Sequence, residues 1–498
     1  MNTFIRDLLT DYQRYWFQTG LLLILLILFA WNVGTPVLHI WDEARLAVNA
    51  AEMLRSGDWL ITRYNGQPDL WNTKPPLLIW LQAASLYLLG YNTWAIRLPS
   101  ILAALATAWL IYRFGRYTLG SRFTGTFAAL ILATSPGYNG THVARFGDYD
   151  ALLTLCLTAT ALSWYQYSQR QRTRQLWLGT FWFALDLLTK SAAALLLLPA
   201  VAVYLVAQPA GRWVFWQGRT YTALAAACGP LVLFYSLREA VEPGYLAATW
   251  FNDWYGRLTQ HVVTVSYPWW IYFQRLLFPG LLTWIPLLPV GIWLGTLAQP
   301  AAAPKHRFAQ FASVYVLVFI VLISVARTRL TWYGAPVYPM TALLCALGLE
   351  YLIRQALNRW RWSRKVIGSV LVLALVLPAG VLLHHEWTRW DTEQTESTLH
   401  YGYQLPQLIR IRPQLGPFTI LHEKRRNAIL DFYVAALREQ GVRPITVTTF
   451  DSTAQQLHPH QQLLICAEPI HRYVQQHFYT QPLTSVAPCA FIEIVSCK

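Results

Sequence analysis

The stretch that decides the fold is GLLLILLILFAWNVGTPVLHIWDEAR, residues 20–45, in which an apolar run passes directly into adjacent carboxylates. Residues 20–31 carry no charge, and with their flanks they are long enough to cross a bilayer, which takes about 20 residues. No small-x-small cleavage signal follows, so we expect an uncleaved first helix over 18–37. Asp42 and Glu43 then stand just beyond this first predicted span.

The composition is typical of a membrane protein. Of 498 residues, 55% are hydrophobic and only 13% are charged, whereas a soluble domain carries about 25% charged residues. The 24 Trp and 27 Tyr suit a protein with two membrane interfaces, where amphipathic rings settle. A net charge of +15 would suggest nucleic acid in a soluble chain. Here the basic residues lie in short loops between apolar runs, so we expect no nucleic-acid partner.

We predict a mainly α-helical, polytopic membrane protein with about eleven transmembrane helices. The predicted spans are 18–37, 95–113, 122–139, 150–168, 174–189, 190–207, 213–237, 270–297, 308–326, 333–353 and 366–385. The two spans that flank Lys190 could also form one long kinked segment.

Charge predicts the orientation of these spans. The loops on one side hold fifteen basic residues and no acidic one: Arg113, Arg116, Arg122, Arg170, Arg172, Arg174, Arg212, Arg219, Lys305, Arg307, Arg354, Arg359, Arg361, Arg364 and Lys365. The opposite loops hold Asp42, Glu43, Glu52, Asp58, Asp69, Asp148, Glu239, Glu242 and Asp253. The positive-inside rule therefore predicts an inner-membrane protein with a cytoplasmic N-terminus and an extracytoplasmic C-terminus.

Two domains are expected. Residues 1–385 form the transmembrane domain, and its first outer loop, 38–94, is predicted to hold two interfacial helices, 42–56 and 77–89. A third interfacial helix is expected over 245–261.

Residues 386–498 are predicted to form a small soluble α/β domain, because strand and helix patterns alternate there after a polar stretch at 387–416. The expected strands are 418–421, 444–450, 463–467 and 490–496, and the expected helices are 425–440 and 470–477. Cys466, Cys489 and Cys497 allow one disulfide on the oxidising side and leave one cysteine over.

Ionisable residues gather on the outer face in five separate loops. Taken singly, each has a structural interpretation: Asp42 and Asp150 as helix N-caps, Lys74 as an interface lysine that snorkels. Those interpretations do not explain why carboxylates and cations meet at one membrane boundary. A lipid-linked sugar phosphate would use both, because cations hold the phosphate and a carboxylate deprotonates an acceptor hydroxyl.

A resemblance to a known family rests on several motifs in order: DEAR at 42–45, GDW at 57–59, KPPL at 74–77, RLPS at 97–100, Arg145, DALL at 150–153, LTK at 188–190, Arg257, and Tyr333 with Pro336 and Pro339. This series resembles the membrane glycosyltransferases of the protein-mannosyltransferase and aminoarabinose-transferase superfamily, which have the GT-C fold. The resemblance covers roughly residues 20–350, and its motifs are specific as a set.

The resemblance implies an enzyme that moves a hexose or pentose from a polyprenyl-phosphate donor, with inversion at the sugar. The implied acceptor is a lipid A-like glycolipid, a polysaccharide or a protein on the periplasmic face. Asp42 would be the principal catalytic carboxylate, with Glu43 in support and Asp150 as a second acidic site. The candidate ligands of the donor phosphate or headgroup are Arg45, Lys74, Arg145, Lys190, Arg257, Arg329 and Tyr333.

One departure from the family concerns a metal. Aminoarabinose transferases carry Glu immediately before the motif lysine, and that Glu can bind a metal together with a loop histidine. This chain has Thr73 there, which leaves His261 as the remaining candidate ligand. We therefore expect no certain cofactor, and the substitution argues against a divalent metal.

Two other classes of function stay open. A lipid or small-molecule transporter or flippase would place ionisable groups near the bilayer midplane, where only Asp186 is expected. A structural or receptor protein would instead act through the soluble tail.

Overall fold

The computed structural model describes residues 2–40, 42–140, 142–263, 267–296, 303–393, 397–412, 415–423, 427–442, 445–450 and 457–498. The chain divides into two compact units. The helical unit comprises Met1–Trp31, Pro68–Leu78 and Leu98–His385, and the mixed unit comprises Asn32–Gln67, Ile79–Arg97 and Glu386–Lys498.

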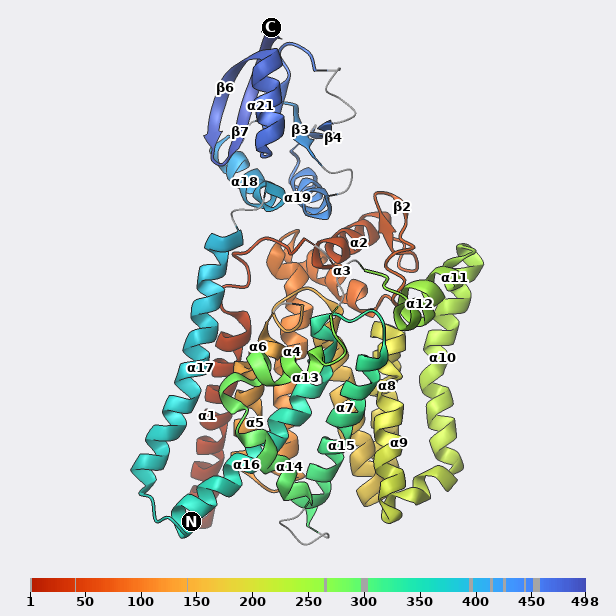
Figure 1. Ribbon diagram of the computed structural model, residues 1–498, viewed down its shortest axis with the longest axis vertical. Coiled ribbons are helices and arrows are strands. Elements are labelled where there is room, and N and C mark those ends of the chain that lie inside the picture. Colours follow the sequence, from red (N-terminus) through yellow and green to blue (C-terminus); the bar gives the residue numbers. More distant parts are fainter. Residues whose placement is uncertain are drawn as a thin grey trace. The chain divides into compact units, whose positions relative to one another are not determined.

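Helices make up most of the described residues, as the sequence predicts, and they are labelled in Figure 1. Up to residue 393 they are α1 (Asn2–Ala30), α2 (Asp42–Ser56), α3 (Leu77–Leu89), α4 (Thr93–Tyr117), α5 (Arg122–Thr134), α6 (Pro136–Asn139), α7 (Tyr149–Arg170), α8 (Thr173–Ala194), α9 (Leu197–Ala207), η1 (Pro209–Trp216), α10 (Gly218–Val241), α11 (Tyr245–Thr249), η2 (Trp250–Trp254), α12 (Tyr255–Thr259), α13 (Ile271–Arg275), η3 (Leu276–Leu281), η4 (Leu282–Trp284), α14 (Leu287–Thr296), α15 (Pro304–Val325), η5 (Thr331–Val337), α16 (Tyr338–Asn358) and α17 (Arg364–Glu393). The helices expected at 42–56 and 77–89 are present as α2 and α3.

Five helices among the described residues are long and apolar enough to cross a membrane. They are Thr93–Tyr117, Gly218–Val241, Pro304–Val325, Thr331–Asn358 and Arg364–Thr388. Two further pairs pass the same test together but bend sharply, α8 with α9 by 92° and the segment from α13 to α14 by 99°. The mainly helical membrane fold is confirmed, and the number of eleven spans stays a prediction.

The expected single span at 270–297 is instead a broken helix. Pro279 stands inside η3, and Pro286 stands between η4 and α14. Proline lacks the backbone donor that continues a helix, and its ring clashes with the preceding turn, so the chain bends here. Helix α8 is itself kinked at Lys190, whose φ of −154° and ψ of 77° are not helical, and it ends at Ala194, before α9 begins at Leu197.

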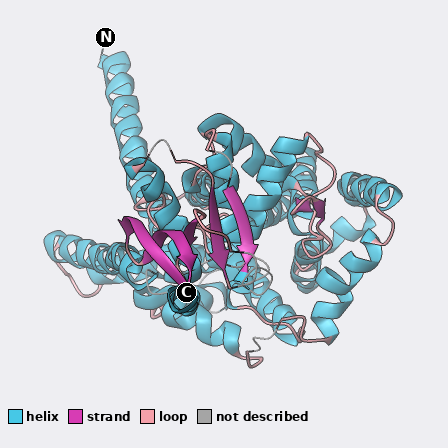
Figure 2. Cartoon of the chain, turned by 90° about the horizontal axis from the view of Figure 1, so that it is seen from above, coloured by secondary structure: helices cyan, strands magenta, loops and turns pink. Residues whose placement is uncertain are grey.

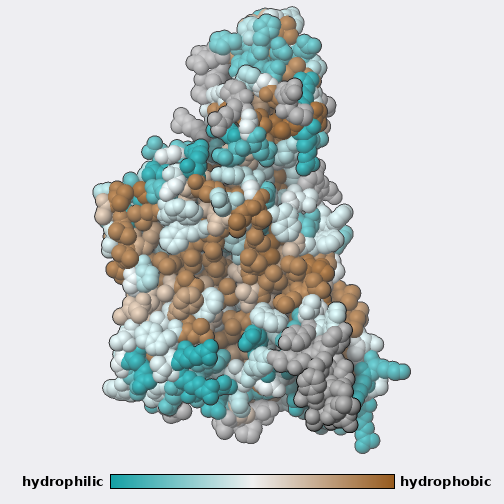
Figure 3. Space-filling model, turned by 180° about the vertical axis from the view of Figure 1, so that it is seen from behind, coloured by the Kyte–Doolittle hydropathy of each residue, from teal (hydrophilic) through white to brown (hydrophobic). Residues whose placement is uncertain are grey.

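The helical unit shows the surface expected of a protein in lipid. Figure 3 shows hydrophobic side chains gathered in a broad band on one face. Exposed large hydrophobic residues recur along α1, α10, α15 and α17, including Leu23, Ile27, Val232, Leu233, Leu317, Val321, Val372, Leu373 and Val376. In water such surface would be costly, so lipid is its natural environment.

The interior of the helical unit is built around α7, which is buried along nearly its whole length. It packs against α8, and α16 packs against α5 and α14. Small residues allow close helix approach: a Cβ on Gly115 of α4 would lie 2.5 Å from the Cα of Gly125 on α5. Such close contact strengthens packing where lipid removes the hydrophobic driving force between helices.

The C-terminal residues form the predicted α/β domain, whose strands are drawn in magenta in Figure 2. Its elements are α18 (Ser397–Ile411), β3 (Phe418–His422), α19 (Ala428–Glu439), β4 (Ile445–Thr449), β5 (Gln462–Ile465), α21 (Glu468–His477), β6 (Phe478–Val486) and β7 (Cys489–Cys497). The sheet order is β4-β3-β5-β7-β6, with β3 parallel to β4 and β5, and β7 antiparallel to β5 and β6. A short hairpin precedes this domain in the chain. Its two strands, β1 (Arg63–Tyr64) and β2 (Gln67–Pro68), have two residues each.

Two elements of this domain were not expected from the sequence. Helix α18 lies inside the polar stretch 387–416, and its pattern is obscured by Pro406. Tyr401, Leu405 and Leu408 are nonetheless buried on one face at helical spacing. Strand β6 was missed because its alternation is broken by Pro482. Arg425 and Pro444, which begin two predicted elements, lie outside the described residues.

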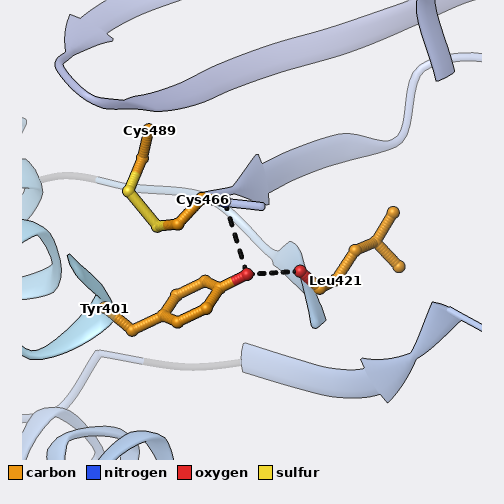
Figure 4. The surroundings of a disulfide bond; sticks show 4 residues. All are labelled: Tyr401, Leu421, Cys466 and Cys489. Atoms are coloured by element: carbon orange, nitrogen blue, oxygen red, sulfur yellow. Dashed lines mark hydrogen bonds between the residues drawn. A yellow bond between two sulfur atoms is a disulfide. The ribbon is translucent and has the colours of Figure 1, made fainter. Parts of the chain in front are cut away.

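A disulfide joins Cys466 to Cys489, and Cys497 is exposed and free. The bond ties the end of β5 to the start of β7. Figure 4 shows Tyr401 beside it, donating its hydroxyl hydrogen to Leu421 O at 2.6 Å and accepting from Cys466 N at 3.3 Å. Helix α18 is thereby attached to two neighbouring strands.

We predict that four of the six cysteines react with a maleimide after denaturation without reductant, because the other two are joined. Mass spectrometry should show two further labels after reduction. In the control Cys497→Ser, one label fewer should appear before reduction. Six labels on the unreduced protein would contradict the disulfide.

Candidate functional site

Asp253 joins two separated parts of the helical unit. It lies on the π-helical turn η2, and its Oδ2 accepts a 2.6 Å hydrogen bond from Thr73 Oγ1. Its Oδ1 lies 3.6 Å from Lys74 Nζ and 3.8 Å from Arg257 Nε. Because all three charged side chains are less than 20% exposed, water screens these attractions only weakly.

The ionisation of Asp253 is fixed by this environment. Burial acts to raise the pKa of the carboxyl, but the charges of Lys74 and Arg257 and the Thr73 hydroxyl outweigh it. The pKa of Asp253 therefore lies below its usual range, and the carboxylate stays negative near neutral pH.

The segment before α3 is held in place by side chains of α11 and η2, which donate hydrogen bonds to its backbone carbonyls. Asn252 Nδ2 donates to Leu70 O at 2.8 Å, and Tyr245 Oη donates to Thr73 O at 2.7 Å. Lys74 is thus presented by a segment in which the carbonyls of Leu70 and Thr73 are hydrogen-bonded. The i, i+4 spacing of Asp253 and Arg257 brings their side chains to one side of the helical turns from η2 to α12.

A second ion pair, Lys190 with Asp150, is linked to this cluster through Tyr333. Arg257 donates a hydrogen bond to the hydroxyl of Tyr333, and Lys190 Nζ lies 4.9 Å from the centre of the Tyr333 ring. Lys190 Nζ also contacts both oxygens of Asp150, at 3.1 and 3.3 Å. Asp150 stands in the first turn of α7, and Lys190 stands at the break in α8, where the non-helical backbone turns its side chain toward α7.

Tyr149 borders the same cluster. Its ring centre lies 5.4 Å from Lys74 Nζ, and its hydroxyl donates to Asn72 Oδ1 at 3.2 Å. Asp148 caps α7 by accepting from Tyr149 N, and it also binds His142 Nδ1 at 2.8 Å. These contacts fix the start of α7, and therefore the position of the Asp150 carboxylate.

The cluster brings three cations together with two carboxylates that contact them directly, and a third carboxylate, Asp148, lies at the start of α7. Lys74, Lys190 and Arg257 supply three cations, while Asp150 and Asp253 supply two carboxylates. A guanidinium, two ammonium groups and a phenol hydroxyl form a donor set that suits a phosphate group. The arrangement can thus hold an anion with its cations already positioned.

Three other predicted site residues of the helical unit have different surroundings. Arg145 donates to Leu28 O at 3.0 Å and to Trp31 O, so it binds carbonyls at the C-terminal end of α1. Arg329 donates to Ser324 O at 3.1 Å and to Tyr267 O at 2.9 Å. His261 is exposed beyond the end of α12. The roles of these three residues as ligands stay predictions.

Glu43 belongs to the mixed unit and is fully buried. Its Oε1 and Oε2 accept from Arg97 Nε and NH2 at 2.7 and 2.8 Å, and Oε2 also accepts from His39 N at 2.6 Å. Arg97 further donates to the carbonyls of Val33 and Pro36, at 2.7 and 3.0 Å. Both charged groups are therefore occupied in holding residues 33–43, which positions the start of α2.

Asp42 and Arg45 also lie in the mixed unit. Asp42 is half-buried in the first turn of α2, where the helix dipole favours a carboxylate. Arg45 lies one turn further on, with its guanidinium 4.7 Å from the centre of the Tyr64 ring. The predicted site residues are thus divided between the two units, with Asp42, Glu43 and Arg45 in one and the others in the second.

Sequence reasoning missed Asp253 as a member of the site. Its spacing of four residues from Arg257 was the available signal, since such pairs meet on a helix. The contact with Thr73 and Lys74 joins positions 180 residues apart, and no local pattern carries that information.

Comparisons with known proteins point in one direction. Residues 73–240 match the family described as dolichyl-phosphate-mannose-protein mannosyltransferase. A protein of Pectobacterium carotovorum named undecaprenyl phosphate-alpha-4-amino-4-deoxy-L-arabinose arabinosyl transferase is 27% identical, over 73% of this chain and 66% of that protein. The protein of the same name from Edwardsiella ictaluri is 28% identical, over 74% and 66%. The chain thus spans just under two thirds of the length of these curated relatives.

Solved structures share the fold. The crystal structure of ArnT from Cupriavidus metallidurans bound to undecaprenyl phosphate matches with a TM-score of 0.69 and 17% identity, over 96% of this chain and 97% of that chain. The oligosaccharyltransferase of Archaeoglobus fulgidus matches with a TM-score of 0.51 and 11% identity, over 85% and 64%.

We predict that Asp253→Asn lowers the free energy of unfolding by about 1–3 kcal/mol near neutral pH, because two cations lose their carboxylate. The folded pKa of Asp253 is depressed, so its contribution is present above the unfolded value and is lost as pH falls through the folded value. The difference from wild type should therefore shrink below about pH 4. Thermal unfolding in detergent measures it.

The matched control is Glu468→Gln, an exposed acid on α21. It should change the unfolding free energy by less than about 0.5 kcal/mol at either pH. An Asp253→Asn protein as stable as wild type at neutral pH would contradict the ion-pair assignment.

Proposed function

We propose that the chain is a membrane glycosyltransferase of the GT-C superfamily, which includes protein mannosyltransferases and aminoarabinose transferases, and that it transfers a sugar from a polyprenyl-phosphate donor to an acceptor. The observation that carries the proposal is the cationic cluster of Lys74, Lys190 and Arg257. Three cations held close together, with a phenol hydroxyl beside them, offer the donors that an anionic headgroup binds.

The donor phosphate binds among these cations. Arg257 offers a flat array of donors that suits phosphate oxygens, Lys74 adds a point charge, and Tyr333 adds a hydroxyl. Asp253 holds Lys74 and Arg257 in place before the donor arrives, so little rearrangement is needed on binding. As the glycosidic bond breaks, negative charge grows on the leaving phosphate, and the same cations stabilise it.

The sugar is transferred with inversion. Asp42 takes the proton from an acceptor hydroxyl as that oxygen attacks the sugar carbon, and the polyprenyl phosphate leaves from the opposite side. Where the acceptor is itself a phosphate, no base is needed, and Asp42 then orients the acceptor and stabilises positive charge on the sugar. Glu43 and Asp150 support the site through Arg97 and Lys190.

The reaction takes place on the periplasmic side of the inner membrane. Support comes from the fifteen basic residues in the loops on the other side, which favour a cytoplasmic N-terminus. A membrane-impermeant maleimide applied to sealed spheroplasts should then label Cys497. Protection of Cys497 until the membrane is opened would contradict this orientation.

The proposed acceptor is a glycolipid resembling lipid A, with a polysaccharide or a protein as the other candidates. Mass spectrometry of envelope glycolipids and glycoproteins, from cells with and without this protein, identifies both the sugar and the acceptor. Transport is less well supported, because most cations and carboxylates of the cluster stand at helix starts and in loops, on the side that the charge pattern predicts to be outer. Transporter sites lie instead near the bilayer midplane.

Lys74→Ala should raise the KM for the donor at least about tenfold, because removing one charge-assisted hydrogen bond costs about 1.5–3 kcal/mol. The assay is sugar transfer in detergent with a polyprenyl-phosphate sugar. Arg327→Ala, an exposed arginine in the connection before η5, is the matched control and should behave as wild type. An unchanged KM in Lys74→Ala would refute phosphate binding by this residue.

Asp42→Asn should reduce kcat by at least about a hundredfold with hydroxyl acceptors, since general-base catalysis contributes that much or more. The side chain keeps its size and is half-buried at a helix start, so folding should be retained. Glu242→Gln, in another outer loop, serves as the control. Near-normal turnover in Asp42→Asn would rule out the catalytic assignment.

Thr73 stands where the resemblance implies a metal-binding acid, and His261 is exposed, so these two positions do not form the metal site that the resemblance implies. We propose that transfer needs no divalent metal, because protein cations already stabilise the leaving phosphate. Turnover should survive incubation with EDTA. Loss of turnover, restored by added metal, would contradict this.

A further inference from the structure

A cavity lies wholly within the mixed unit, between α2 and α19. Its volume is about 400 Å³, within the range of small-ligand sites. The residues of α2 and α19 that line it are Val48, Ala51, Glu52, Arg55, Asp431, Phe432, Val434, Ala435, Arg438 and Glu439.

Helical spacing explains why these residues share one cavity. On α2, Val48, Glu52 and Arg55 recur at intervals of four and three residues, which places them on one face. On α19, Asp431, Ala435 and Glu439 recur every four residues and do the same. The two faces are small or charged where they meet, so they leave a space between them.

Polar groups of the cavity are already oriented. Asp431 is half-buried and its Oδ2 accepts a 2.8 Å hydrogen bond from Tyr64 Oη. Glu52 Oε2 accepts a 2.9 Å hydrogen bond from Gly66 N, in the hairpin turn. Each carboxylate makes this contact through one oxygen, Oδ2 of Asp431 and Oε2 of Glu52. The other oxygen of each remains available to a ligand.

The charges of the cavity do not balance. Glu52, Asp431 and Glu439 supply three carboxylates, while Arg55 and Arg438 supply two guanidinium groups. Burial and the charge of Glu52 raise the pKa of Asp431, against the effects of Tyr64 and Arg438. Two carboxylates therefore lie close enough to repel each other, and a cationic group of a ligand would relieve the repulsion.

An aromatic ring completes the lining. Tyr91 stacks on Phe432 with ring centres 6.4 Å apart and an angle of 26° between the planes. Mixed acids and guanidinium groups beside an aromatic ring offer both donors and acceptors to a ligand rich in hydroxyls.

We propose that this cavity binds a saccharide that carries protonated amino groups, by means of Glu52, Asp431, Glu439 and Tyr91. The inference rests on the proposed function, in which the saccharide is the remote part of a glycan acceptor. Glu52 lies ten residues after Asp42 on the same helix, or about 15 Å at 1.5 Å per residue. Binding at this distance from the reacting end can supply energy that orients the acceptor.

The test measures binding by calorimetry with the full-length protein in detergent, without any donor. The probes are a glucosamine trimer and the matching N-acetylglucosamine trimer, which differ by the charge of the amines. We expect the glucosamine trimer to bind at least tenfold more tightly. We also expect Glu439→Gln, and separately Asp431→Asn, to weaken its binding at least fivefold.

The variants are chosen to keep the fold. An asparagine at 431 can still accept the hydrogen bond from Tyr64, and the side chain of Glu439 is exposed. Glu468→Gln, an exposed acid on α21 of the same unit, is the control and should bind as wild type. Thermal unfolding of each variant shows that binding, and not folding, has changed.

Equal affinity for the two trimers, or unchanged binding in both cavity variants, would overturn the proposal. Because no donor is present, the result is independent of sugar transfer. A protein that binds the charged trimer but transfers no sugar would keep the cavity and overturn the proposed function. Normal transfer without selective binding would keep the proposed function and overturn the cavity proposal.

Discussion

Two loops of the helical unit meet at one carboxylate, Asp253, whose oxygens contact two cations and a hydroxyl. Lys74 and Thr73 reach it from the segment before α3, and Arg257 reaches it from the next turn of its own loop. A charge this shielded from water must have partners, since an unpaired one would cost several kcal/mol. The two loops therefore pack against each other in the folded protein. This packing holds the cations in position before a ligand binds.

Buried charge plays a different part in the mixed unit. Glu43 and Arg97 satisfy each other and the carbonyls around residue 33, so little of their capacity is left for a ligand. In the Asp253 cluster, the side chains of Lys74 and Arg257 stay slightly exposed, so they can still contact a ligand. The Glu43–Arg97 pair thus fixes the backbone, whereas the Asp253 cluster can act on a substrate. Asp42, beside Glu43, is positioned by the Glu43–Arg97 pair.

The sequence was informative where a pattern is local. Apolar runs predicted the membrane helices, and strand and helix periods predicted most of the C-terminal sheet. It failed at prolines: Pro286 breaks an expected span, whereas Pro406 stands inside a helix that was not expected. It also placed Lys74, Lys190 and Arg257 in the site without their partner Asp253. Pairing across 180 residues is decided by the tertiary fold, which one sequence does not reveal.

The resemblance to aminoarabinose transferases implies an acid at the position of Thr73, and the threonine found there alters the site without removing its cations. An acid at that position would place a second carboxylate beside Asp253, and the two would repel each other. A threonine instead donates a hydrogen bond to Asp253 at 2.6 Å and adds no charge. The carboxylate that balances Lys74 thus comes from another loop. Lys74, Arg257 and Lys190 stay close together, and in the proposed function they bind the anionic donor.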